Sequence, residues 1–387
     1  MENFIFKNET KIIFGKDTEN NVGKEILKYG KKVLFHYGAG SIKKSGLYEK
    51  IIRSLEDSGI TVFELGGVKP NPVVSLIRQG IKICREEKVD FILAVGGGSV
   101  IDSTKAIAMG VNYEGDIWDF FEGKAKLESA LPTGVILTIP AAGSESSVVT
   151  VITNEDGLLK RGFHSSMLLP KFAILNPELT YTLPVFQVAC GAADILAHTF
   201  ERYFTQSENV DLTDRLCEGL MKSVIENSKI AISSPGNYAA MAELMWASTI
   251  AHNGILGTGR IEDWASHRLG HEISALFGIT HGASLAVIFP AWMKYVCQYN
   301  IKRFAQFAQR VFNVNSDFGD EEWLAQRGID ELVYYLKELG LPTTLSELKI
   351  PLDKIDLMAQ KAVARGPLGN FIKIQKEDAV KIYELAI

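Results

Sequence analysis

The chain has 387 residues, of which 47% are hydrophobic and 22% are charged, and its formal net charge is −5. This composition is typical of a soluble globular protein with more than one domain, and the lack of a long Lys/Arg tract argues against a nucleic-acid partner. The apolar stretches are too short to span a bilayer, so we expect no membrane partner.

Cysteine usage and the first residues both bear on the compartment. The four cysteines, Cys84, Cys190, Cys217 and Cys297, are far apart and form no CxxC pair. A disulfide framework or a cysteine-based zinc site is therefore not expected, and a reducing compartment fits. The opening stretch MENFIFKNETKIIFG has no long apolar run after a basic start, which argues against a signal peptide. We expect a cytoplasmic protein.

Up to about residue 180, short β-branched and aromatic runs alternate with helical stretches. The alternation predicts an α/β domain over residues 1–180, with a parallel sheet that carries helices on both faces. The expected strands are residues 11–15, 31–38, 61–67, 91–97, 134–140, 148–153 and 171–176. The helical stretches that separate them include residues 47–59 and 73–88.

A glycine-rich turn, HYGAGSIKKSG (36–46), ends the first long strand. In many NAD-binding folds an acidic residue near this point accepts hydrogen bonds from the ribose hydroxyls. Here the turn offers small residues, a hydroxyl and then Lys43 and Lys44, which would tolerate a 2′-phosphate. The turn favours NADP(H) over NAD(H), although NAD(H) stays open.

A second turn lies in FILAVGGGSVIDSTKAIAMG (91–110), where an apolar strand leads through three glycines into a helix. Glycines let the backbone come close to a ligand, and the new helix offers its first N–H groups to an anion. This pattern predicts a cradle for a pyrophosphate, and the alternative is a tight turn with nothing bound. It is neither the GxGxxG fingerprint, because Ile101 stands where the third glycine belongs, nor a P-loop. The stretch TIPAAGSESS (138–147) also ends a strand in small hydroxyl residues.

After Pro184 the β-rich runs fade and apolar residues recur at helical spacing. The expected helices lie in residues 185–204, 212–232, 238–256, 329–340 and 379–387. We therefore expect an all-helical domain over residues 181–387, packed on the α/β domain with a cleft between the two.

Three of the seven histidines fall within the sixteen residues HRLGHEISALFGITHG (267–282). His267 and His271 are four residues apart, and so are Asp194 and His198 upstream, which places each pair on one face of a helix. With His281, these residues offer a mixed oxygen and nitrogen site suited to Fe(II), Zn(II) or a similar divalent ion. The alternative is that the histidines are ordinary core or surface groups.

The combination of GGGSVIDSTKAI, TIPAAGSES, the Asp194–His198 pair and HRLGHEISALFGITHG resembles the iron-containing (group III) alcohol dehydrogenase family. The resemblance runs over essentially the whole chain and is strongest to the branch of NADPH-dependent butanol and aldehyde dehydrogenases. It implies that Asp194, His198, His267 and His281 hold the metal, and that His271 is a site histidine that is not a ligand.

The resemblance also implies a set of cofactor contacts. At the adenosine end these are Gly38, Gly40 and Ser41. The pyrophosphate region would be lined by Asn71, Gly97, Gly98, Ser99 and Asp102. The nicotinamide and its ribose would lie along Thr138, Ser147, Lys160 and Leu179. Position 147 departs from the family pattern, because close relatives carry Asn there.

The implied activity is reversible hydride transfer between NADP(H) and an aliphatic primary alcohol or aldehyde such as butanol or butanal. The metal would be Fe(II), with Zn(II) as the alternative, and would act as a Lewis acid on the carbonyl oxygen. His271 is a candidate proton relay, and the protein would be a homodimer. Two rival functions stay open: a metal- and NAD-dependent cyclase or lyase of the dehydroquinate synthase type, and a metal-stabilised binding protein without turnover.

Overall fold

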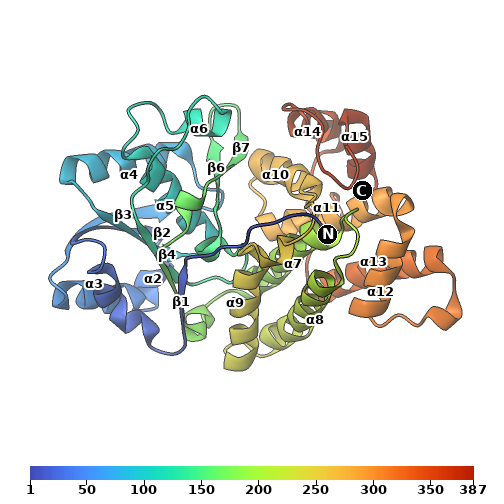
Figure 1. Ribbon diagram of the computed structural model, residues 1–387, viewed down its shortest axis with the longest axis horizontal. Helices are drawn as coiled ribbons and strands as arrows, with labels where there is room; N and C mark the ends of the chain where they lie inside the picture. The colour runs from blue at the N-terminus through green and yellow to red at the C-terminus, as the bar shows by residue number, and fades with distance from the viewer. The chain divides into compact units, whose positions relative to one another are not determined.

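The computed structural model of the protein describes residues 1–387, apart from the side chain of Phe318. Two compact units divide the chain, and we name them by their main content (Figure 1). The sheet unit consists of Lys7–Leu183 and Gly236–Thr249. The helical unit consists of Met1–Phe6, Pro184–Pro235 and Ile250–Ile387. The domain boundary expected near residue 180 stays a prediction.

A six-stranded sheet in the order β1-β8-β5-β4-β2-β3 forms the centre of the sheet unit, and every neighbouring pair is parallel. Its strands are β1 (Lys11–Phe14), β2 (Lys32–Gly38), β3 (Thr61–Val68), β4 (Phe91–Gly96), β5 (Thr133–Leu137) and β8 (Phe172–Leu175). The parallel sheet with helices that the sequence predicts is therefore confirmed.

Side chains alternate between the two faces of this sheet, and both faces are covered. Val33 and Phe35 of β2 pack against α1 and α3, whereas Leu34, between them, packs against α4 and α5. Figure 1 shows α3 and α4 on opposite sides of the strands. The helices of this unit are α1 (Val22–Ile26), α2 (Ser41–Lys44), α3 (Leu47–Asp57), α4 (Val74–Glu87), α5 (Gly98–Gly110), α6 (Trp118–Glu122) and most of α9 (Tyr238–His252). Its short 3-10 helices are η1 (Thr18–Asn21), η2 (Ser144–Ser146), η3 (Ser166–Leu168) and η4 (Pro177–Thr180).

One expected strand lies outside the parallel sheet. The run 148–153 forms β6 (Val149–Asn154), which pairs in antiparallel fashion with β7 (Leu159–His164) to make a separate hairpin. The two strands are joined by a short turn that contains Gly157 with a positive φ of 78°. Such a short connection allows antiparallel pairing but is too short for a parallel crossover.

The helical unit is built from amphipathic and fully buried helices. These are α7 (Val185–Tyr203), α8 (Asp211–Ser233), α10 (Ala265–Phe277), α11 (His281–Val296), α12 (Ile301–Val311), α13 (Glu321–Glu338), α14 (Ile355–Ala362) and α15 (Lys376–Glu384). Shorter 3-10 segments are η5 (Ile255–Gly257), η6 (Cys297–Tyr299), η7 (Ser316–Phe318) and η8 (Leu352–Lys354). Among the described residues, none of the helices combines the length and the apolar character that crossing a membrane requires.

Candidate functional site

The sheet unit contains a topological switch point between β2 and β4. These strands are neighbours, with Tyr37 opposite Val95 near their carboxyl ends. The chain leaves β2 for α2 and α3 on one face and leaves β4 for α5 on the other. In open α/β sheets ligands bind at such a point, outside the carboxyl ends of the strands. Both glycine-rich turns that the sequence singles out lie at this point.

The turn after β4 brings the backbone close to its neighbours. Gly97 is the N-cap of α5, and Gly98 is its first residue. A Cβ atom at Gly97 would lie 3.1 Å from Ile139, and one at Gly98 would lie 3.2 Å from Ala142. Ser99 follows in the first turn of α5, half-buried. The arrangement leaves the first N–H groups of a 13-residue helix at the edge of the sheet, as a phosphate site requires.

The turn after β2 carries the residues expected at the adenosine end. Gly40 adopts a φ of 124°, which only glycine accommodates without strain, and Ser41 opens the short helix α2. Gly38 ends β2 with ordinary space around it, since a Cβ atom would meet its nearest neighbour at 3.7 Å. Lys43 lies over the ring of Tyr48, with Nζ 4.5 Å from the ring centroid.

Two further predicted cofactor residues contact each other. The Nζ of Lys160, on β7, donates a hydrogen bond to Oδ1 of Asn71 at 2.8 Å. Asn71 has a φ of 58° and precedes α4. Thr138 follows β5 and donates its backbone N–H to the carbonyl oxygen of Gly96 at 3.0 Å. Leu179 packs instead against the core cluster on the α1 and α3 face of the sheet.

Asp102 and Ser147 lie where α5 meets the loop after β5. The carboxylate of Asp102 accepts hydrogen bonds from the Ser144 hydroxyl at 2.6 Å and from the Val151 N–H at 3.0 Å. The Ser147 hydroxyl accepts from the Val149 N–H at 3.1 Å. Asp102 thus ties α5 to residues 144–151, whereas the Ser147 hydroxyl makes a bond within that segment.

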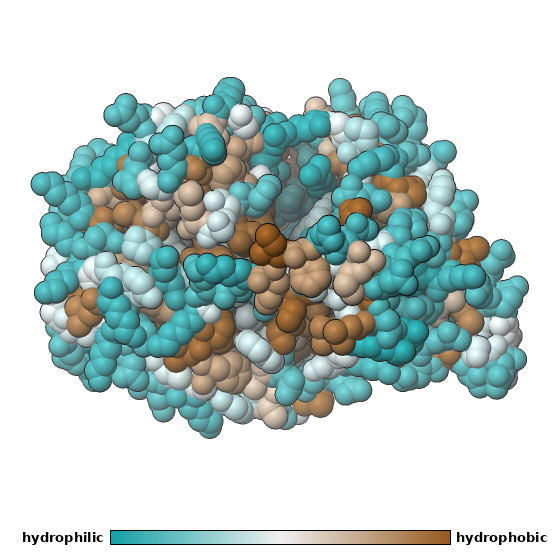
Figure 2. All heavy atoms as spheres, viewed as in Figure 1, coloured by the Kyte–Doolittle hydropathy of each residue, from teal (hydrophilic) through white to brown (hydrophobic). Residues whose placement is uncertain are grey.

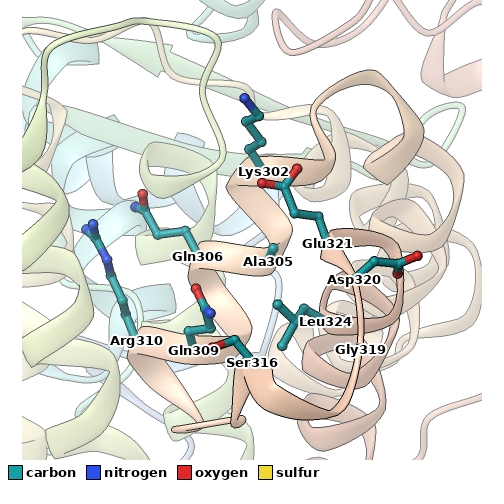
Figure 3. Close-up of a pocket in the computed structure, with 10 residues that line it drawn as sticks. All are labelled: Lys302, Ala305, Gln306, Gln309, Arg310, Ser316, Gly319, Asp320, Glu321 and Leu324. Carbon is teal, nitrogen blue, oxygen red and sulfur yellow. The ribbon is translucent and has the colours of Figure 1, made fainter.

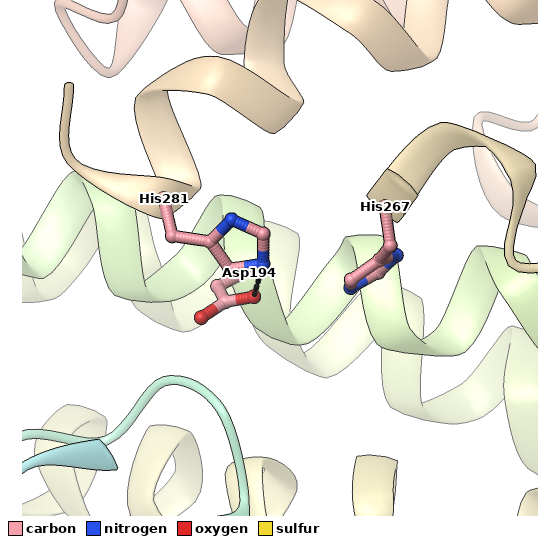
Figure 4. A group of neighbouring side chains, drawn as sticks. All are labelled: Asp194, His267 and His281. Carbon is pink, nitrogen blue, oxygen red and sulfur yellow. Dashed lines mark ion pairs between the residues drawn. The ribbon is translucent and has the colours of Figure 1, made fainter. Parts of the chain in front are cut away.

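In the helical unit, three of the predicted metal ligands come together. Asp194 of α7, His267 of α10 and His281 of α11 each offer a ligand atom, and these atoms lie within 4.8 Å of one another (Figure 4). Oδ1 of Asp194 is 4.0 Å from Nε2 of His281. A Cβ atom at Gly282 would lie 2.0 Å from the carbonyl oxygen of Cys190, so glycine lets α11 begin directly against α7.

His198, the fourth predicted ligand, lies beside this group without being one of its three members. Its ring centroid is 4.6 Å from that of His267, and its Nδ1 is 3.2 Å from Oδ1 of Asp194. The same Nδ1 donates to the carbonyl oxygen of Asp194 at 2.8 Å. A carbonyl oxygen can only accept, so the bond places the proton on Nδ1 and the lone pair on Nε2.

Glu201, one turn beyond His198 on α7, fixes His267 in the same way. Its Oε1 accepts from Nδ1 of His267 at 2.7 Å, and its Oε2 accepts from the backbone N–H of Trp264 at 2.5 Å. Burial raises the pKa of the Glu201 carboxyl to about 7. Trp264, at the N-cap of α10, has a φ of 69°, an uncommon conformation for a bulky side chain. The carboxylate therefore holds both the start of α10 and the imidazole that α10 carries.

These residues fit a divalent transition metal. One carboxylate and imidazole nitrogens form a donor set suited to iron or zinc rather than magnesium or calcium. Two of the imidazoles, His198 and His267, donate their Nδ1–H to a carbonyl or carboxylate oxygen, which is the arrangement usual for metal-ligating histidines.

Two other histidines lie next to the group. His271 is half-buried, with its ring centroid 5.2 Å from that of His281. His252 is 9% exposed, with its ring centroid 4.4 Å from that of His198. The sequence identifies His271 through its spacing from His267. For Glu201 the only signal is the helical face that it shares with Asp194 and His198. For His252 the sequence offers no signal that places it at this site.

A cavity of about 430 Å³ lies between α12 and α13 and contains none of the predicted site residues (Figure 3). Its polar lining is already engaged: Arg310 donates to Glu218 at 3.2 Å, and Gln306 donates to Asp214 at 3.1 Å. The acidic and basic groups of this cavity pair with one another, and none of them forms a candidate catalytic or metal-binding group. The histidine cluster therefore remains the candidate reactive centre of the unit.

Two family models match the chain, one in each half. The family model described as iron-containing alcohol dehydrogenase matches residues 9–177, and the model for the C-terminal part of the same family matches residues 188–387. The chain is 43% identical to a probable NADH-dependent butanol dehydrogenase 1 of Bacillus subtilis, and the match covers 100% of both chains. It is 38% identical to the NADPH-dependent aldehyde reductase YqhD of Escherichia coli, again over 100% of both chains. The structure of an NADH-dependent butanol dehydrogenase A from Thermotoga maritima superposes with a TM-score of 0.97 at 42% identity, covering 100% of this chain and 99% of that one.

Proposed function

The chain belongs to the iron-containing alcohol dehydrogenase family, and from this premise we propose that it is a metal-dependent aldehyde reductase and alcohol dehydrogenase acting on aliphatic primary alcohols and aldehydes. That it is an NAD(P)-linked alcohol dehydrogenase follows from the family and the relatives. The metal role, the preference for NADPH and the substrate range are our proposal. The observation that carries it is the cluster of Asp194, His267 and His281, with ligand atoms within 4.8 Å of one another.

Asp194, His198, His267 and His281 are the proposed metal ligands. When bound, Fe(II) or Zn(II) would supply Lewis-acid stabilisation of the negative charge that develops on the carbonyl oxygen. Glu201 holds the His267 ring so that Nε2 presents its lone pair. His271, half-buried beside His281, is the proposed relay that exchanges a proton with solvent, because an imidazole titrates near neutral pH.

The sheet unit would hold the cofactor at its switch point. We assign the phosphates to the start of α5, at Gly97 and Ser99, and the adenosine end to the turn that contains Gly38 and Ser41. The preference for NADPH is supported by the absence of an acidic side chain in that turn and by Lys43, which lies beside it. The relatives include both NADH- and NADPH-dependent proteins, so this preference needs a direct measurement.

The cyclase or lyase alternative lacks support in the helical unit. Such an enzyme binds a charged, phosphorylated substrate and needs cationic side chains at its site. Arg260 is 6% exposed and its guanidinium is occupied by Asp214, at 3.0 Å, and by two carbonyl oxygens. Arg268 is exposed on α10 and is the other cation that the sequence offers nearby. Because Arg260 is already occupied, we propose a neutral substrate.

We also propose that the protein is a cytoplasmic homodimer. The four cysteines are free thiols, which fits a reducing compartment. β1 is an edge strand of the sheet, and the residues before it include Phe4 and Ile5, which are 53% and 98% exposed. Figure 2 shows apolar side chains exposed among hydrophilic ones on the face in view. A light-scattering mass of twice 42.7 kDa is expected, and a monomer mass would refute the dimer.

The central experiment follows nicotinamide absorbance while purified protein, loaded with Fe(II) or Zn(II), is mixed with NADPH and butanal. We expect oxidation of NADPH that depends on both the metal and the aldehyde. His267→Ala should lose metal and activity together, as measured by elemental analysis and rate. Failure of the wild type to oxidise NADPH with any metal loaded would refute the proposed function, and full metal occupancy in the variant would refute its assignment as a ligand.

A further inference from the structure

Lys105 is a buried cation that the proposed function leaves unused. It lies on α5, two turns after the glycine-rich turn, and its side chain is fully buried. Lysine is almost never fully buried unless its ammonium group is paired. Burial lowers the pKa of Lys105 to about 8, while the nearby carboxylates of Asp102 and Glu145 act in the opposite direction. These two carboxylates favour the charged form of the Lys105 side chain.

Four oxygen atoms surround the ammonium group, and all belong to one loop. Nζ lies 2.7 Å from the carbonyl oxygen of Ser144, 2.7 Å from that of Ser147 and 2.8 Å from that of Val149. The Ser144 hydroxyl oxygen is the fourth, at 3.0 Å. Three carbonyl groups of one short segment thus point at a single cation, so the segment is wrapped around the Lys105 head group.

This loop adjoins the proposed pyrophosphate site. The residues just before it, Ile139 and Ala142, are those that a Cβ atom at Gly97 or Gly98 would meet at 3.1 and 3.2 Å. The chain from 138 to 149 therefore forms a wall beside the start of α5. Thr138 and Ser147, assigned to the cofactor above, both lie on this wall. A shift of the loop would move the wall against the bound nucleotide.

Stability alone does not explain a lysine at this position. A buried charge is costly to desolvate, and an apolar side chain of similar volume often serves a protein core as well or better. An apolar side chain cannot hold three carbonyl oxygens in one direction, however, whereas an ammonium group can. Asp102 also holds this segment, through Ser144 and Val151, but only Lys105 gathers its carbonyl oxygens.

We propose that Lys105 is a positioning residue for the cofactor: its ammonium group organises loop 144–149 so that the wall beside α5 receives the nicotinamide half of NADPH. The proposal rests on the proposed function of the sheet unit. Lys105 acts through the loop and does not touch the reacting atoms.

The test compares two ligands on wild-type protein and Lys105→Met. One ligand is NADPH, and the other is 2′-phospho-ADP-ribose, which keeps the adenosine and pyrophosphate but lacks the nicotinamide. Both Kd values are measured by calorimetry, with thermal denaturation as the check on folding. We expect the variant to bind NADPH about tenfold more weakly and the fragment with nearly unchanged affinity. The matched control is Lys82→Met on α4, whose side chain is 73% exposed and which should change neither Kd.

The outcomes separate the inference from the function on which it rests. If the wild type binds neither NADPH nor NADH, the proposed function fails. If the wild type binds and Lys105→Met binds NADPH equally well, or loses both ligands to the same extent, the positioning role is overturned.

A second variant covers a failure of Lys105→Met to fold. Ser144→Ala removes one of the four oxygens, together with the hydrogen bond that its hydroxyl donates to Asp102, and keeps the lysine. We expect NADPH to bind two- to threefold more weakly, on the order of half of the tenfold effect in free energy, and the fragment to bind with nearly unchanged affinity. Unchanged NADPH affinity in that variant would overturn the proposal. Ethylammonium added to Lys105→Ala should restore NADPH affinity, because it returns an ammonium group to the same oxygens.

Discussion

At the scale of single residues, the candidate metal site depends on groups that fix its imidazoles as much as on the ligands themselves. His267 is 3% exposed, and its Nδ1 is committed to Glu201. His198 is held through the carbonyl oxygen of Asp194. In each case a single hydrogen bond selects the tautomer whose Nε2 can coordinate a metal. The carboxylate of Glu201 also raises the basicity of the imidazole that it holds.

Replacing Glu201 by Gln should therefore weaken metal binding while leaving every ligand in place. The amide oxygen can still accept from Nδ1, but the amide brings no negative charge, and its NH2 group cannot accept from the Trp264 N–H, so we expect the metal affinity to fall about 10- to 100-fold. Competition with a chelator of known affinity measures the change. Glu331→Gln is the matched control, because it removes a partly exposed carboxylate of α13 that pairs with Arg327. Equal metal affinity in Glu201→Gln and wild type would contradict the orienting role.

We expect the choice between NADPH and NADH to depend on the turn that contains Gly38. A side chain fits here, since a Cβ atom would meet only ordinary contacts, at 3.7 Å from the Val68 carbonyl oxygen and 4.0 Å from Val100. Gly38→Asp places a carboxylate where the 2′-phosphate of NADPH is expected. Charge repulsion should then weaken NADPH binding on the order of tenfold, whereas NADH, which lacks this phosphate, should be little affected. Fluorescence titration with both cofactors measures the ratio. Gly38→Asn supplies the same volume without charge, and a ratio that shifts equally in both variants would show that size, not charge, decides.

At the scale of elements, His36 joins three parts of the sheet unit. It lies on β2, donates from Nδ1 to the carbonyl oxygen of Leu65 on β3 at 2.7 Å, and accepts through Nε2 from the Ser103 hydroxyl on α5 at 2.8 Å. It is fully buried, and burial lowers its pKa to about 4. The neutral ring satisfies both neighbours, so this part of the fold is built around an uncharged histidine.

Stability should therefore fall on acidification. Between pH 6.5 and pH 4 the histidine is protonated in the unfolded chain but not in the folded one, so unfolding takes up a proton. The free energy of unfolding should drop with falling pH by up to about 3 kcal/mol over this window because of His36. Urea unfolding at a series of pH values should give a shallower pH dependence for His36→Gln than for wild type. His164→Gln changes an exposed histidine of the same unit and is the matched control. Parallel curves for His36→Gln and wild type would refute the assignment.

Elements with a strong local pattern were predictable, and those that depend on distant partners were not. β4, FILAVG, is a continuous apolar run, and the sequence places it correctly in a parallel sheet. β7, LKRGFH, mixes polar and apolar residues without a regular pattern, so the sequence does not predict it as a strand. The antiparallel pairing of β6 with β7, which keeps β6 out of the main sheet, is therefore not evident from the sequence either. The histidine pairs follow from helical spacing. The roles of Glu201 and Lys105 do not follow from local spacing, because their partners are distant in the sequence. The partners of Glu201 lie 63 and 66 residues away, and those of Lys105 lie 39 to 44 residues away.

At the scale of the whole molecule, each unit has its own core and supplies a different part of the proposed chemistry. The sheet unit holds the candidate nucleotide residues, and the helical unit holds the candidate ligands. The helical unit contains a cluster of buried aromatic side chains on α7, α11 and α12. Its members include Phe200, Phe204, Phe289, Trp292, Phe304 and Phe307, each at most 3% exposed. We therefore expect this apolar core to persist without a metal ion.

Removal of the metal should accordingly abolish activity and leave the fold in place. Dialysis against a chelator should keep the helical circular dichroism at 25 °C, and the melting transition should move to lower temperature, because a bound ion stabilises the folded state by about 3 to 4 kcal/mol when present at 100 to 1,000 times its Kd. Reloading with Fe(II) or Zn(II) should restore turnover. In His267→Ala the chelator should change little, because the site is already impaired. A loss of helical signal on chelation of the wild type would instead mean that the ion holds the helical unit together, as expected for a metal-stabilised binding protein.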